Sequence, residues 1–189
     1  MNRMIYDQKL MASKLIRWEA YMENYNLPSW EELPDMELYM DQLVSLVKRY
    51  LSLFPEDEQN PVVTPSIINN YVRLKVMPAP ERKRYTRRHV AYTIMICALK
   101  QTMTLTEIQK VIPPDLQEQQ IRQLYNDFVR KITTATQLFM DQVRETAYQV
   151  LVPENDHGCE SLVLHSAVTS MLYKLLTVKL TGLQSHGEE

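Results

Sequence analysis

The chain has only three glycines among its 189 residues, and they are not clustered. Tight hairpins between strands usually need glycine or an Asn-Gly pair, because their turns require a positive φ. No long alternation of apolar and polar residues suggests strands instead. Hydrophobic residues make up 45% of the chain, which is enough to form a proper core. We therefore expect an all-α protein.

Prolines and capping residues divide the chain into predicted helices. Thr64-Pro65 is typical of a helix start, and Thr104 with Glu107 has the spacing of a capping box. Thr86 is a candidate cap for the helix that follows it. The expected helices span about residues 3–24, 34–53, 65–74, 87–101, 105–112, 116–151 and 160–180. The last of these is apolar on nearly all sides, so we expect it to be buried rather than to span a membrane.

We interpret the chain as four consecutive segments. Residues 1–62 form N-terminal helices, and 38–53 is the candidate first helix of a helix-turn-helix. Residues 63–112 form the core, and 113–183 form a long helical hairpin for packing or dimerisation. Residues 184–189 are expected to be a disordered tail.

Positive charge is concentrated between Arg73 and Lys110. This segment has nine Lys or Arg and two acidic residues, a net charge of +7, although the whole chain has a net charge of −2. Such separation of charge is typical of a binding site for a polyanion. It is equally typical of a solvated helix flank.

The predicted helix 65–74 has one polar face. On a helical wheel, Ser66, Asn69, Asn70 and Arg73 share an arc of about 100°. Asn and Arg side chains read base edges or hold phosphates in nucleic-acid complexes. Taken alone, such a face is more often an ordinary exposed surface. The interpretation as a DNA-binding face therefore depends on the positively charged segment that follows it.

Several short motifs resemble MerR-type transcriptional regulators. Tyr71, Arg73 and Pro78 match the recognition helix and its exit, Arg84-Tyr85-Thr86 matches the end of the wing, and 104–108 (TLTEI) matches the next helix start. The resemblance implies a winged helix-turn-helix with a minimal β-wing, flanked by the N-terminal helices and the C-terminal helical hairpin. Together with the charge pattern, it indicates these DNA-binding residues: Ser66, Asn69, Asn70, Arg73, Lys75, Arg82, Lys83, Arg84, Tyr85, Arg87 and Arg88.

A longer stretch resembles a bacterial family known only as domain of unknown function 1836. The matching segments are 27–34 (LPSWEELP), 38–42 (LYMDQ), 64–71 (TPSIINNY) and 83–85 (KRY). This resemblance spans about residues 27–112 and implies no activity.

The expected function is sequence-specific recognition of double-stranded DNA by a cytoplasmic transcriptional regulator. The resemblance to MerR implies a homodimer, and we place its interface in the C-terminal helices. The predicted helix 116–151 also has an apolar stripe at close to heptad spacing, which permits packing within one chain as well. Its members are Ile121, Leu124, Phe128, Ile132, Ala135, Phe139 and Val143. The alternative function is a protein-interaction module whose basic patch binds an acidic partner.

An enzyme is not expected, because the chain has no Gly-rich phosphate loop, nucleophile elbow or HExxH motif. His157, Cys159 and His165 match no common zinc spacing, so neither a metal nor a cofactor is expected. Cys97 and Cys159 are far apart in sequence, as is usual for free thiols of a reducing cytosol. The first residues lack the apolar run of a signal peptide, and no membrane association is expected.

Overall fold

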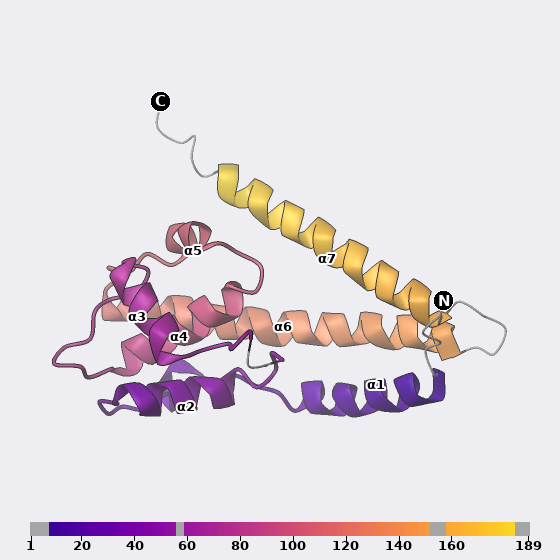
Figure 1. The fold of residues 1–189 in the computed structure, drawn as a ribbon, viewed down its shortest axis with the longest axis horizontal. Coiled ribbons are helices and arrows are strands. Elements are labelled where there is room, and N and C mark those ends of the chain that lie inside the picture. The colour runs from indigo at the N-terminus through magenta and orange to yellow at the C-terminus, as the bar shows by residue number, and fades with distance from the viewer. Residues whose placement is uncertain (1–7, 56–58, 152–157, 184–189) are drawn as a thin grey trace. The chain divides into compact units, whose positions relative to one another are not determined.

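A computed structural model describes residues 8–55, 59–151 and 158–183. Within these ranges the chain is helical and contains no β-strand, which confirms the expected all-α class (Figure 1). The predicted tail 184–189 lies outside the described residues. The elements are α1 (Gln8–Glu23), a 3-10 turn η1 (Trp30–Glu32), α2 (Met40–Tyr50), α3 (Pro65–Arg73), α4 (Arg87–Leu99), α5 (Leu105–Val111), α6 (Glu118–Leu151) and α7 (Gly158–Leu183).

The predicted caps explain where the helices begin. The Ile67 amide donates to Thr64 Oγ1 at 3.2 Å, and the Thr104 amide donates to the Glu107 carboxylate at 2.7 Å. Both arrangements satisfy amides that have no partner inside the helix.

Helix α2 begins later than the sequence predicts, at Met40 instead of near residue 34. The reason is an antiparallel bridge between Leu38 and Tyr85, whose amides each donate to the other's carbonyl at 2.8 and 2.9 Å. A backbone that pairs in this way has an extended conformation, so α2 starts only after it.

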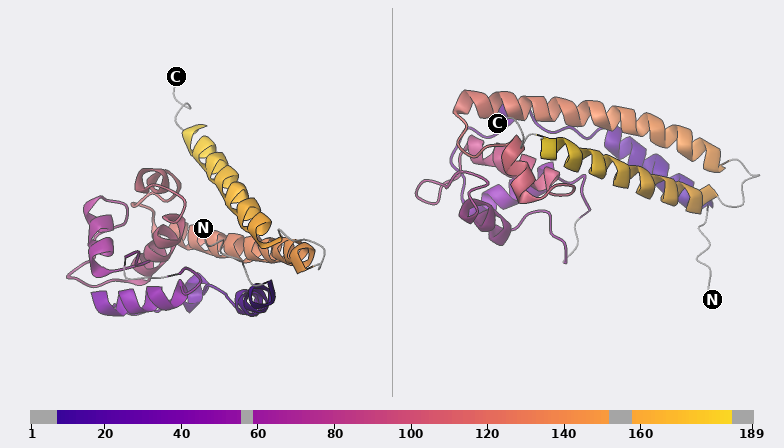
Figure 2. Two further views of the ribbon diagram at one scale, coloured as in Figure 1. Left: turned by 45° about the vertical axis from the view of Figure 1, so that its right-hand side comes forward. Right: turned by 90° about the horizontal axis from the view of Figure 1, so that it is seen from above.

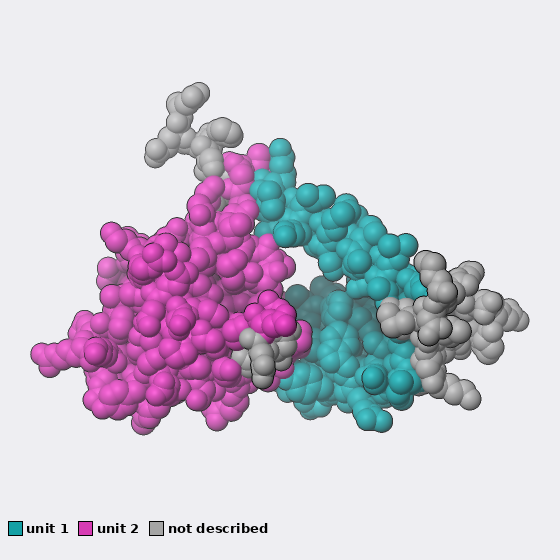
Figure 3. Space-filling view, viewed as in Figure 1, with its two compact units in different colours: residues 1–26, 132–179 teal, residues 27–131, 180–189 magenta. Residues whose placement is uncertain are grey.

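The described chain divides into two compact units, shown in different colours in Figure 3. One consists of residues 1–26 and 132–179, and we call it the arm unit. The other consists of residues 27–131 and 180–189, and we call it the central unit. Both units combine stretches that are distant in sequence, whereas the predicted segments are consecutive.

The core of the central unit is built around α4. Its residues 89–98 are all buried, and α2, α3 and α5 surround it (Figures 1 and 2). Trp30 and Tyr125 extend this core with an edge-on ring contact at 6.3 Å. The Tyr125 hydroxyl also donates to the Pro28 carbonyl at 3.0 Å, so α6 is fixed to the segment before α2.

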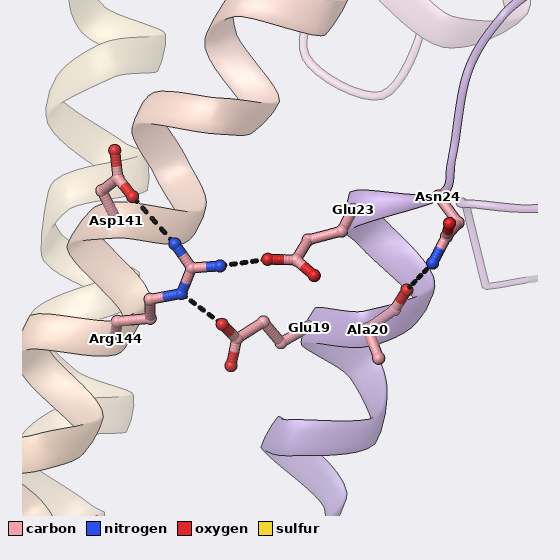
Figure 4. Close-up of polar contacts among 6 residues, drawn as sticks. All are labelled: Glu19, Ala20, Glu23, Asn24, Asp141 and Arg144. Atoms are coloured by element: carbon pink, nitrogen blue, oxygen red, sulfur yellow. Dashed lines mark hydrogen bonds and ion pairs between the residues drawn. The ribbon is translucent and has the colours of Figure 1, made fainter.

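The arm unit is joined by charged and aromatic contacts between α1 and the second half of α6. The Arg144 guanidinium forms ion pairs with Glu19, Glu23 and Asp141 (Figure 4). Trp18 packs edge-on against Phe139, with ring centroids 5.8 Å apart. Phe139 of the long helix thus contacts α1, although its side chain remains 44% exposed.

Helix α7 corrects the expectation of a buried last helix. Most of its large apolar side chains are exposed, including Leu164 (67%) and Tyr173 (66%). Its apolar composition explains the prediction, but the buried residues of α7 that the structure describes, Cys159 and Thr181, lie near its two ends. By length and composition alone, Cys159–Leu183 could also cross a membrane, with a mean hydropathy of 1.3.

Candidate nucleic-acid interface

The polar face of α3 is open to solvent. Ser66, Asn69 and Arg73 are exposed, and Asn70 is half-buried. Arg73 Nη2 donates to Asn70 Oδ1 at 2.7 Å, so these two side chains are held together along the helix. The described part of the chain therefore leaves this face uncovered.

The opposite face of α3 anchors the helix. Ile68 and Tyr71 are buried, and the Tyr71 hydroxyl lies against the Cys97 thiol of α4. Burial raises the pKa of Cys97 to about 12, so this thiol stays protonated and unreactive near neutral pH. Tyr71 and Cys97 thus fix the orientation in which α3 presents its polar face.

Helix α3 ends in a Schellman motif with Lys75 in the left-handed conformation, at φ 55°. The Val76 amide donates to the Tyr71 carbonyl at 2.9 Å, and the Lys75 amide donates to the Val72 carbonyl at 3.0 Å. Gln109 Nε2 of α5 donates to the carbonyls of Leu74 and Lys75, both at 3.1 Å. Gln109 was not predicted, because nothing in its local sequence indicates a contact with α3.

Residues Glu81–Arg84 form a two-residue turn, which we call the basic turn. Its central residues Arg82 and Lys83 both have positive φ, 47° and 60°, and the Arg84 amide donates to the Glu81 carbonyl at 2.7 Å. Positive φ at both central positions is the type I′ geometry of β-hairpins, where Asn-Gly is preferred. Here two exposed cations occupy these strained positions.

The basic turn is attached to the segment before α2. Tyr85 is buried and shares the backbone bridge with Leu38. The Arg84 guanidinium lies over the Tyr39 ring, 3.6 Å from its centroid. Arg84 and Tyr85, both predicted to contact DNA, therefore also position Arg82 and Lys83.

His89, which its sequence context did not single out, joins α4 to the residues on either side of the basic turn. Its Nδ1 accepts the Thr86 amide at 3.0 Å, and its Nε2 lies 3.3 Å from the Ala79 carbonyl. The ring therefore fits the neutral tautomer with hydrogen on Nε2. Burial lowers the pKa of His89, and the neighbouring positive charge of Arg88 adds to this effect. Its position three residues after the Thr86 cap was a signal that could have found it.

Arg87 and Arg88 are turned toward the protein. Arg87 Nε donates to the Leu33 carbonyl at 3.1 Å, and its guanidinium lies 3.5 Å from Asp35. Arg88 Nη2 donates to the Pro114 carbonyl at 3.1 Å. Both side chains are half-buried, so they serve packing more directly than an external ligand.

The predicted residues thus separate into two groups. Tyr85, Arg87 and Arg88, with half-buried Arg84, form contacts inside the central unit. The other group lies on α3, at its end and on the basic turn. Its exposed members are Ser66, Asn69, Arg73, Lys75, Arg82 and Lys83, and half-buried Asn70 accepts a hydrogen bond from Arg73.

The residues considered for zinc binding are not brought together in the part of the chain that the structure describes. Cys159 is buried and His165 is exposed, while His157 lies outside the described residues. Among the described residues, no cluster of three or more His, Cys, Asp or Glu has the arrangement of a metal site.

The model of the family described as domain of unknown function 1836 matches residues 28–128. The chain belongs to this family. The match includes the whole candidate interface, from η1 through α5 to the first part of α6. No significant match to a curated protein or to a solved structure was found.

Proposed function

We propose that this member of the family is a non-enzymatic, cytoplasmic transcriptional regulator that binds double-stranded DNA as a dimer through a MerR-like winged helix-turn-helix. The observation that carries the proposal is the uncovered polar face of α3, with exposed cations at its end and on the basic turn. A surface of this kind suits a ligand that combines base edges with phosphates.

Helix α3 would enter the major groove with α2 packed behind it. Its inner residues are fixed in the core, so Asn69 and Arg73 project from a rigid support. Asn pairs with adenine through two hydrogen bonds, and Arg pairs in the same way with guanine or holds a phosphate. A dimer would place two such helices about one turn of DNA apart.

The basic turn would act as a minimal wing. Arg82 and Lys83 extend from a hairpin-like turn, and their left-handed backbone is a strain that is often found at functional sites. Each cation that neutralises a phosphate releases counterions, so the affinity should fall as salt concentration rises.

Fluorescence anisotropy with labelled duplex fragments at about 50 and 200 mM salt tests the proposal. We expect salt-dependent binding that the double substitution Arg82→Glu with Lys83→Glu abolishes. The matched control is Arg130→Glu with Lys131→Glu, which changes the charge equally at exposed positions of α6. Absence of salt-dependent binding by the unaltered protein would reject the proposal.

The same surface could hold an acidic protein instead of DNA. Competition distinguishes these functions, because unlabelled duplex should displace labelled duplex from a regulator more effectively than polyglutamate does. Binding to polyglutamate with no binding to duplex would instead favour the protein-interaction module.

A further inference from the structure

The arm unit contains a cavity between the end of α1 and the second half of α6, which we call the arm cavity. Its volume is about 420 Å³, which is in the range of small-molecule sites in proteins. Each helix contributes one buried methionine to the lining, Met22 (4% exposed) and Met140 (3% exposed). All the lining residues belong to the arm unit. The two methionines give the arm cavity an apolar part that can contact a hydrocarbon stem.

Much of the remaining lining consists of polar side chains. Gln137, Met140 and Arg144 line the arm cavity, and their spacing of three and four residues places them on one side of α6. Thr136 adds a hydroxyl beside Gln137, and Asn26 adds an amide from the residues that follow α1. Hydroxyl and amide oxygens accept hydrogen bonds. The lining can therefore hold a ligand that donates hydrogen bonds.

The charged residues of the arm cavity carry an excess of negative charge. The Arg144 guanidinium forms ion pairs with Glu19, Glu23 and Asp141 (Figure 4). Three carboxylates with one guanidinium have a net charge of −2. Glu23, Asp141 and Arg144 line the cavity itself. Because a cleft lined by one sign of charge concentrates ions of the opposite sign, the arm cavity should attract a cation.

The carboxylates also keep acceptor atoms beside Arg144. The guanidinium contacts Oε1 of Glu23 and Oδ1 of Asp141, and in Figure 4 no bond joins it to the second oxygen of either residue. An ionised carboxylate accepts through both oxygens, so an ammonium group can bind the second ones without displacing Arg144. Among the described residues, no group of His, Cys, Asp or Glu is arranged to hold a metal ion. An organic cation therefore suits this site better than a metal ion does.

We propose that the arm cavity binds a small aliphatic amine with two or more ammonium groups. One ammonium group would donate to Glu23 and Asp141, and the hydrocarbon stem would lie along the two buried methionines. The side-chain oxygens of Thr136 and Gln137 would accept from a second ammonium group. The site goes beyond the proposed function and does not depend on it, because the candidate DNA interface belongs to the central unit.

Isothermal titration calorimetry of the full chain with spermidine, in the absence of DNA, tests the charge of the site. We expect one molecule to bind and Asp141→Asn to weaken the affinity about fivefold. Asp141 is suited to this test because Arg144 keeps its ion pairs with Glu19 and Glu23, which hold α1 to α6.

The matched control is Asp127→Asn. Asp127 also lies on α6 and pairs with an arginine three residues later, Arg130, at 2.8 Å, but it does not line the arm cavity. The control removes the same charge from the same helix, so its spermidine affinity should stay near that of the unaltered protein.

A second variant tests the cavity without changing its charge. Thr136→Leu places a larger apolar side chain in the lining and should weaken spermidine binding about fivefold, because it removes the hydroxyl and part of the space. Thr134→Leu is its control, since Thr134 is exposed on the same helix and lies outside the lining. Circular dichroism of each variant shows whether the helices are kept.

Three results would overturn the proposal. The first is no spermidine binding by the unaltered protein, and the second is equal affinity of Asp141→Asn and Asp127→Asn. The third is binding that magnesium chloride abolishes at an ionic strength where sodium chloride does not, since a simple metal ion would then be the preferred ligand. A chain that binds duplex DNA with salt dependence but ignores spermidine would contradict only the arm cavity, and the converse would contradict only the regulator.

Discussion

Lys75 shows how one residue combines structural strain with a candidate contact. It is the left-handed residue of the Schellman motif, a position at which glycine is preferred because it has no Cβ. The sequence predicted Lys75 as a DNA contact. It did not predict the left-handed conformation, because that depends on the exact residue at which α3 ends.

Replacing Lys75 by glycine should therefore stabilise the chain. Relief of the left-handed strain is expected to raise the free energy of unfolding by about 1 kcal/mol, as measured by urea denaturation. Leu74→Gly is the control, since Leu74 has an ordinary φ of −83° and should lose stability instead. Equal effects of the two substitutions would contradict this explanation.

His89 should make stability depend on pH. Its pKa in the folded chain is lowered from the ordinary 6.5, chiefly by burial, so the folded chain binds its proton less readily than the unfolded chain does. Its contribution is therefore fully present above pH 6.5 and is lost as the pH falls through the folded pKa.

The variant His89→Gln tests this dependence. Glutamine at this position can still accept the Thr86 amide but does not titrate. Urea denaturation at several pH values should show that wild type loses more stability than the variant as the solution becomes acidic. Parallel pH profiles would show that His89 does not carry the effect.

At the scale of elements, we expect the basic turn to lower the stability of the chain and to raise its affinity for duplex DNA. Asn-Gly fits a type I′ turn without strain, so Arg82→Asn with Lys83→Gly is expected to raise the melting temperature. The same change removes two exposed cations and should weaken duplex binding. The control Arg130→Gln with Lys131→Gln removes two cations elsewhere, and its duplex affinity should stay near that of wild type.

Most helices could be predicted because their caps are local in sequence. Thr64 and Thr104 each mark a start that the structure reproduces within a residue. The late start of α2 could not be predicted, because it depends on pairing between Leu38 and Tyr85, which are far apart in the chain. The same reason explains why Gln109 was missed at the candidate site.

The inward direction of Arg87 and Arg88 could not be predicted either. Sequence shows that a residue is charged, but the direction of its side chain depends on carbonyls supplied by other elements, here those of Leu33 and Pro114. The exposed set on α3 was predictable because a helical wheel separates its polar face from buried Ile68 and Tyr71.

For the molecule as a whole, the two units relate differently to the family. The family match, residues 28–128, lies within the central unit and contains the candidate interface. The arm unit lies outside that match. Arg144 is a polar connection within it, because its one guanidinium meets carboxylates on both α1 and α6.

Arg144→Gln should therefore loosen the arm unit while leaving the central unit intact. The three carboxylates would lose their shared cation and repel one another, so α1 should separate more often from α6. Hydrogen–deuterium exchange should become faster in α1, while exchange in α4 stays at the wild-type rate because its residues 89–98 are buried in another core.

Arg17→Gln serves as the control. Arg17 is an exposed residue of α1, and its replacement should leave exchange in α1 unchanged. Faster exchange throughout α4 would mean that the two units do not unfold independently.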